Sequence, residues 1–158
     1  MCCRLRILVT GDRNWRNAER VRDCLYDVAR NDTIDDDGCY QDLTLVEGEA
    51  MGADIYARVV VELEIADWDG YYPRWVAIDP FPADWKQFGP AAGPIRNTQM
   101  RKSGVDFVVG FHNDIASSRG TKDMLKQCAK AGIPGRLFTE EGEVDGWENL
   151  VLPATRSS

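Results

Sequence analysis

Short apolar runs rich in β-branched residues recur along the chain and alternate with segments that have the hydrophobic spacing of helices. The runs predict strands at residues 5–10, 43–46, 75–78, 105–111 and 136–138. The intervening segments predict helices at about 17–30, 54–67, 94–102 and 121–131. Strands that alternate with helices imply a parallel sheet covered on both faces. We therefore expect an α/β, Rossmann-like three-layer sandwich whose mostly parallel sheet has about five strands.

Composition is that of an ordinary globular protein. The 158 residues are 44% hydrophobic and 28% charged, and this length suits one domain that spans residues 1–158. The segment 139–158 is expected to be a partly loose tail. Trp147, Leu150 and Leu152 are its candidates for anchoring the tail to the body.

The net charge of −7 argues against a nucleic-acid binder, which needs a basic surface for phosphates. No apolar run is long enough for a signal peptide or a membrane span, so a cytoplasmic protein without a membrane partner is expected. The five cysteines form no C-x-x-C pair and His112 is the only histidine, which predicts neither disulfides nor a zinc site. The acidic stretch 31–40 is expected to be a solvated loop, so we predict no metal.

Polar turns with glycine follow the predicted strands. Ligands of parallel sheets bind at the carboxyl ends of the strands, where such turns converge. The turn residues that we predict to line a site are Gly11, Asp12 and Arg13 after the first strand, Gly48, Gly52 and Asp54 after the second, and Ser118, Arg119, Gly120 and Thr121 after the fourth.

The turn at 47–54 has two glycines four residues apart before a predicted helix, the usual form of an anion cradle. Glu47 and Glu49 add negative charge, which favours ribose hydroxyls over a bare phosphate at this turn. Asp54 either lines the ribose side or caps its helix.

Residues 82–100 join two apolar runs and are rich in proline and glycine. Pro94 is expected at the first position of a helix, which places Arg96 and Asn97 in its first turn. A guanidinium and an amide beside free backbone N–H groups suit an anion such as phosphate. The alternative is a surface loop that leads into a helix.

The same residues carry a resemblance to the SLOG superfamily, the Rossmann-like fold of Lonely Guy enzymes and DprA proteins. The small YspA/YpsA-like branch, found in phage and bacterial genomes, is the most similar. The resemblance spans nearly the whole chain, and its most specific pieces are Pro-Ala-Asp-Trp at 82–85 and Ala-Gly-Pro-x-Arg-Asn at 92–97. It implies a pocket for nucleotides or nucleotide-derived molecules, either AMP-like or ADP-ribose-like.

Two Lonely Guy motifs carry over in part. In Arg-Lys-x-x-Met, Arg96 and Met100 match while Asn97 replaces the lysine; in Gly-Gly-x-Gly-Thr-x-x-Glu, Gly120 and Thr121 match while Met124 replaces the catalytic glutamate. Cleavage of an N-glycosidic bond needs a nearby carboxylate. The candidates to supply it here are Glu49, Asp54, Asp123 and Asp12.

The resemblance and the turns together suggest roles for the remaining side chains. Arg96 is expected to clamp a phosphate, with Arg13 as a second clamp and Asp12 as a hydroxyl acceptor. Gly120 and Thr121 either contact phosphate or only form an N-terminal turn. Trp85 either stacks on a base or packs as a lid. His112 is expected to be structural.

Two functions are compatible with these residues. The first is a binding module that senses a nucleotide-derived signal or, if the gene is viral, sequesters one, without a cofactor. The alternative is an enzyme, a nucleotide phosphoribohydrolase or related N-glycosidase. DNA processing ranks third, because the net negative charge of the chain disfavours DNA binding. The resemblance also implies a homodimer.

Overall fold

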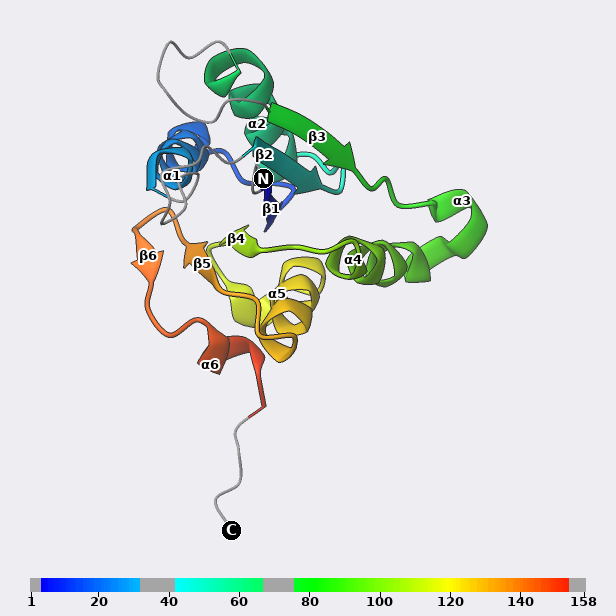
Figure 1. Cartoon of the computed structure of the whole chain (residues 1–158). Coiled ribbons are helices and arrows are strands. Elements are labelled where there is room, and N and C mark those ends of the chain that lie inside the picture. Colours follow the sequence, from blue (N-terminus) through cyan, green and yellow to red (C-terminus); the bar gives the residue numbers. More distant parts are fainter. Residues whose placement is uncertain (1–3, 32–41, 67–75, 154–158) are drawn as a thin grey trace.

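The computed structural model describes residues 4–31, 42–66 and 76–153. One six-stranded sheet has the order β3-β2-β1-β4-β5-β6 (Figure 1). Its strands are β1 (Arg4–Gly11), β2 (Asp42–Glu47), β3 (Val76–Pro80), β4 (Phe107–Phe111), β5 (Gly135–Phe138) and β6 (Glu143–Val144). The first five strands pair in parallel, and β6 pairs antiparallel to β5. The predicted α/β class and mostly parallel sheet are confirmed, with one short strand more than expected.

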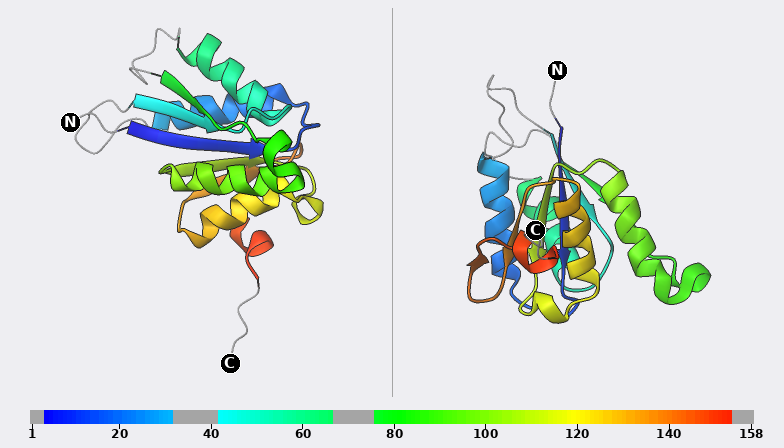
Figure 2. Two further views of the ribbon diagram at one scale, coloured as in Figure 1. Left: turned by 90° about the vertical axis from the view of Figure 1, so that its right-hand side faces the viewer. Right: turned by 90° about the horizontal axis from the view of Figure 1, so that it is seen from below.

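Helices cover both faces of this sheet (Figure 2). The helical segments are α1 (Ala18–Asn31), α2 (Ala53–Val59), the π-helical η1 (Val60–Ile65), α3 (Trp85–Phe88), the 3₁₀ turn η2 (Gly89–Ala91), α4 (Ala92–Lys102), the 3₁₀ turn η3 (Ile115–Ser117), α5 (Gly120–Lys130) and α6 (Glu148–Val151). In the described part of the chain, no helix is both long and apolar enough to cross a bilayer.

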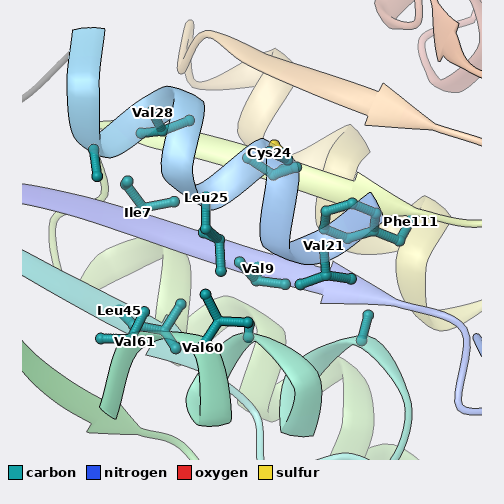
Figure 3. Close-up of a cluster of buried hydrophobic side chains, with 14 of the residues drawn as sticks. Ile7, Val9, Val21, Cys24, Leu25, Val28, Leu45, Val60, Val61 and Phe111 are labelled. Carbon is teal, nitrogen blue, oxygen red and sulfur yellow. The ribbon is translucent and has the colours of Figure 1, made fainter. Parts of the chain in front are cut away.

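Successive strand residues point into two different cores, as the two-residue period of a strand requires. Ile7 and Val9 of β1 lie in a core with Leu25 of α1 and Val60 of η1 (Figure 3). Leu8, between them in sequence, belongs to the opposite core with residues of α4, α5 and α6. A sheet buried on both faces explains why its central strands read as continuous apolar runs.

The order of the strands reverses between β1 and β4. From β1 the chain moves outward to β2 and β3, and then returns to β4 beside β1 before moving outward the other way. The connections from β1 and β4 lead to helices on opposite faces, so a crevice opens between the carboxyl ends of these two strands. Doubly wound sheets bind their ligands at such a point.

Helix α4 begins two residues earlier than predicted. It starts at Ala92, and the Ala92 N–H donates to the carbonyl of Gly89 in the preceding 3₁₀ turn. Pro94 is therefore the third helical residue, and Arg96 and Asn97 lie in the second turn. The expected cluster of free N–H groups beside Arg96 is wrong, because η2 leads directly into the helix.

Two side chains of the last described segment pack on the body of the domain. Trp147 is buried, and its Nε1 donates to the carbonyl of Gly135 at 3.0 Å. Leu152 packs on the same core, as expected. Leu150 is 50% exposed, so its predicted anchoring role is wrong; a one-turn helix buries a single side. Residues 154–158 lie outside the described ranges.

Some predictions concern residues outside the described ranges. Cys2, Cys3, Cys39, Trp75 and all of the acidic stretch except Asn31 are among them. Cys24 and Cys128 are described; both are buried, and neither forms a disulfide within the described residues.

Candidate functional site

A pocket of about 530 Å³ lies at the switch point between β1 and β4. Its walls come from the ends of these two strands, the start of α2, helices α3 and α4, and the N-terminus of α5. The predicted site residues that line it are Gly11, Asp12, Arg13, Asp54, Trp85, Arg96, Asn97, Ser118, Arg119, Gly120, Thr121 and Asp123. Gly48, Glu49 and Gly52, also predicted, do not line it.

Arg96 reaches from α4 across to the turn after β2. Its Nη1 donates to the Gly48 carbonyl at 2.6 Å, and its Nε donates to the Asn97 Oδ1 at 3.2 Å. Within the described residues Nη2 has no hydrogen-bond partner, so one edge of the guanidinium can donate to a ligand. Burial lowers the pKa of Arg96, the Asp54 charge opposes that shift, and the Arg13 charge adds to it.

Two further guanidinium groups line the pocket. Arg13 lies over the Trp85 ring, 5.5 Å from its centroid, in a cation–π contact that joins the turn after β1 to α3. Arg119 lies at the start of α5. Among the described residues neither has a carboxylate partner within salt-bridge distance. Unpaired guanidinium groups around one pocket are suited to an anion.

The turn after β2 does not present its N–H groups to the pocket. The Asp54 Oδ2 accepts hydrogen bonds from the N–H groups of Gly48 at 2.9 Å and Ala50 at 3.3 Å, while the Glu47 Oε2 accepts one from the Glu49 N–H. Glu47 also pairs with Arg58. The protein's own carboxylates therefore occupy the N–H groups of this cradle, which leaves no donor at Gly48, Glu49 or Ala50 for a bare phosphate.

Gly52 has a packing role beneath the pocket. A Cβ on Gly52 would lie 2.3 Å from the carbonyl oxygen of Asp12, and its φ is +80°. The residue lets the turn before α2 approach the turn after β1 closely. It shapes the floor of the site without contacting the pocket.

Asp54 is a buried carboxylate with one oxygen uncommitted among the described residues. Desolvation raises its pKa to about 6, and the hydrogen bonds from Gly48 and Ala50 only partly oppose this. Desolvation also raises the pKa of Glu47, against the opposing effects of the Glu49 N–H and Arg58. Both groups therefore favour their protonated forms more than free carboxyls do.

Asp54→Asn should remove part of the pH dependence of stability. Since the folded pKa is raised from 3.8 to about 6, the fold loses stability as pH rises through this window. Over this window the free energy of unfolding falls by on the order of 3 kcal/mol. Both backbone donors bond to a single oxygen, which an asparagine carbonyl can replace.

Urea unfolding from pH 4 to pH 7 measures this effect. The wild-type curve should fall more steeply with pH than that of Asp54→Asn, while Asp145→Asn, an exposed substitution, should follow the wild type. Parallel curves for wild type and Asp54→Asn would show that Asp54 has no raised pKa.

Asn97 is buried and ties α4 to α5. Its Nδ2 donates to the Gly120 carbonyl at 3.2 Å and to the Asp123 Oδ2 at 3.0 Å. The Asp123 Oδ2 also accepts from Gln127 at 3.0 Å. These bonds fix the N-terminus of α5, whose Gly120 and Thr121 N–H groups have no partner among the described residues. The sequence indicated Asn97 as a ligand contact; the structure adds a positioning role.

His112 lies on the pocket wall and was expected to be structural. Its Nδ1 accepts a hydrogen bond from the Asp114 N–H at 3.0 Å, so Nε2 carries the proton of the neutral ring. That nitrogen lies 4.0 Å from the Asp12 Oδ2. Asp12 also accepts from the Asn14 N–H at 2.9 Å, which holds its carboxylate at the rim. Across the described ranges, no cluster of three metal-ligating side chains occurs.

Among known proteins, a phage gene product is similar to this chain over most of its length. The chain is 32% identical over 133 residues to the "Gene 61 protein" of Mycobacterium phage D29, an alignment that covers 82% of this chain and 92% of that protein. The chain belongs to the family of this phage protein. No family model and no solved structure matches it. The name of the phage relative states no activity.

Proposed function

We propose that this protein binds a nucleotide or a nucleotide-derived small molecule, AMP-like or ADP-ribose-like, and acts as a sensing or sequestering module of the SLOG type. The observation that carries the proposal is the convergence of Arg13, Arg96 and Arg119 on one pocket at the switch point. Arg13 and Arg119 have no carboxylate partner in the described chain, and the Nη2 of Arg96 has no hydrogen-bond partner there.

The remaining pocket groups suit the other parts of a nucleotide. The N-terminus of α5 offers N–H groups to a phosphate. Asp12 and Asp54 can accept hydrogen bonds from ribose hydroxyls. Trp85 is 48% exposed at the rim, where a base can stack on it. A volume of about 530 Å³ lies within the range of small-molecule sites.

The phage relative supports a sequestering role. A phage gains from a protein that captures a nucleotide signal of its host. Capture needs a pocket that binds the ligand and no residues that cleave it. Met124, which replaces the catalytic glutamate of Lonely Guy enzymes, is fully buried in the core and cannot reach a ligand. This favours binding over hydrolysis.

Arg96→Ala should strongly weaken binding of the native ligand. The ligand is identified by mass spectrometry of small molecules that co-purify with the full chain, and binding is measured as the rise in melting temperature with AMP or ADP-ribose. Loss of a charge-assisted contact should weaken binding by about 100-fold. Arg22→Ala, at a surface ion pair on α1, is the control and should retain the shift. An equal shift in Arg96→Ala would contradict the proposal.

An N-glycosidase is the second candidate, because two carboxylates line the same pocket. Asp54 and Asp123 each have one oxygen without a partner in the described chain. If the chain is an enzyme, incubation with AMP, NAD or ADP-ribose releases free base or ribose phosphate, and Asp123→Asn slows this at least about 100-fold. Intact ligands after prolonged incubation would exclude this candidate and leave the binding module.

A homodimer remains a proposal from the resemblance. Four apolar side chains at intervals of four residues support it, because they form an exposed stripe that begins in the turn before α2 and continues along α2 and η1. They are Met51 (69% exposed), Ile55 (42%), Val59 (42%) and Leu63 (66%). An interface along this stripe would remove them from water.

A further inference from the structure

A second compartment of about 320 Å³ adjoins the pocket described above. The two share Arg13, Ala50, Trp85 and Arg96, so these residues form the boundary between them. The smaller compartment extends towards the turn after β2 and the segment before α3. Gly48 and Glu49, which do not line the main pocket, line this one.

The boundary is positively charged. Arg96 and Arg13 both face it, and the charge of Arg13 is close enough to lower the pKa of Arg96. The charge of Asp54 partly offsets that of Arg96, but neither Arg96 nor Arg13 forms a salt bridge within the described residues, and two like charges held near one another are stabilised by an anion. A ligand that occupies both compartments would therefore carry its negative charge in its middle, where it crosses between the two guanidinium groups.

The smaller compartment has the chemistry of a site for a flat base. Met51, Pro82, Ala83 and Trp85 supply apolar surface. Glu49 supplies an acceptor, which can bind an exocyclic amine.

The backbone holds Glu49 in place for such a role. Glu49 has a φ of +55°, the one non-glycine residue with positive φ in the described chain. Its N–H is bonded to Glu47, and its carboxylate lies 3.3 Å from Arg58. Strain of this kind persists where the surroundings enforce it, often at binding sites.

We propose that the native ligand is a pyrophosphate-bridged nucleotide of the ADP-ribose type, not a mononucleotide. Its diphosphate lies between Arg13 and Arg96, its base lies in the smaller compartment against Trp85 and Glu49, and its second sugar lies in the larger pocket. This inference rests on the proposed nucleotide-binding function. To that function it adds which parts the ligand has, namely a base, a diphosphate and a second sugar, and where each part binds.

Calorimetric titration of the full chain with ADP-ribose, AMP and ribose 5-phosphate tests the proposal. ADP-ribose should bind at least about 100-fold more tightly than either half alone, since it gains contacts in both compartments. Ala83→Phe fills the smaller compartment. It should weaken ADP-ribose and AMP by about tenfold or more and leave ribose 5-phosphate within about twofold.

Two further variants guard against loss of folding. Ala131→Phe adds the same bulk at an exposed site that lines neither compartment and should bind like the wild type. Glu49→Gln keeps the side-chain shape and should weaken ADP-ribose several-fold without affecting ribose 5-phosphate.

The outcomes separate this inference from the proposed function. If AMP binds as tightly as ADP-ribose, or if Ala83→Phe and Glu49→Gln bind ADP-ribose like the wild type, the two-compartment ligand is wrong while a nucleotide pocket stands. If none of the three compounds binds the wild type, both proposals fail.

Discussion

Gly48→Ala should strongly weaken ligand binding while leaving the fold intact. A Cβ on Gly48 would lie 2.1 Å from the Arg96 Nη1 and 2.7 Å from its Cζ, so the guanidinium must leave its position. The hydrogen bond to the Gly48 carbonyl is lost with it. The displaced group is the end of a flexible side chain, so the cost to stability should be within about 1 kcal/mol. Binding should fall by about 100-fold, as for Arg96→Ala.

A double-mutant cycle shows whether Gly48 acts through Arg96. In an Arg96→Ala background the added methyl group meets no guanidinium, and Gly48→Ala should then cause no further loss of affinity. Calorimetry of the wild type, both single variants and the double variant, each with a melting curve, completes the cycle. Additive losses would show that Gly48 contacts the ligand by itself and that the clash with Arg96 is not the cause.

Gly52→Ala should have the largest effect on stability. The added Cβ would lie 2.3 Å from the Asp12 carbonyl oxygen and 2.8 Å from that of Arg13, both backbone atoms that cannot rotate away. Its backbone angles, φ +80° and ψ −125°, also suit glycine alone. We expect a loss of about 3 kcal/mol or more, which lowers the melting temperature by roughly 10 °C in a chain of this size.

Gly104→Ala is the matched control for this prediction. Gly104 has a φ of +94°, and no atom lies within 4 Å of the position that a Cβ would take there, so only the backbone cost applies. That cost is about 1–2 kcal/mol. Thermal unfolding of both variants separates the two effects. Equal losses of stability would mean that the turns at Gly52 and Asp12 are not in close contact.

The fold could be predicted because its signals are local. Continuous apolar runs such as that of β4 and the 3.6-residue spacing of α1 each specify one element, and their alternation specifies the parallel sheet. The start of α4 was missed because the segment before it has no such period. There Asp84 caps α3 by accepting from the Gln87 N–H at 3.0 Å, and the 3₁₀ turn at Gly89 leads into α4.

The pocket could be placed from the sequence, since turns after parallel strands meet at one edge. The role of the turn after β2 could not be placed in this way. A glycine-rich turn before a helix has the same sequence pattern whether its N–H groups bond to a ligand or to the chain's own carboxylates. Here Asp54 and Glu47 occupy them, which depends on side chains folding back over the turn. A sequence pattern does not contain that information.

A crystal structure of the full chain grown with AMP tests the central claim most directly. We predict the phosphate within hydrogen-bonding distance of the Arg96 Nη2 in the pocket between β1 and β4, with the Arg96 Nη1 still bonded to the Gly48 carbonyl. Nucleotide bound elsewhere on the protein, or a pocket that stays without nucleotide at saturating AMP, would contradict it.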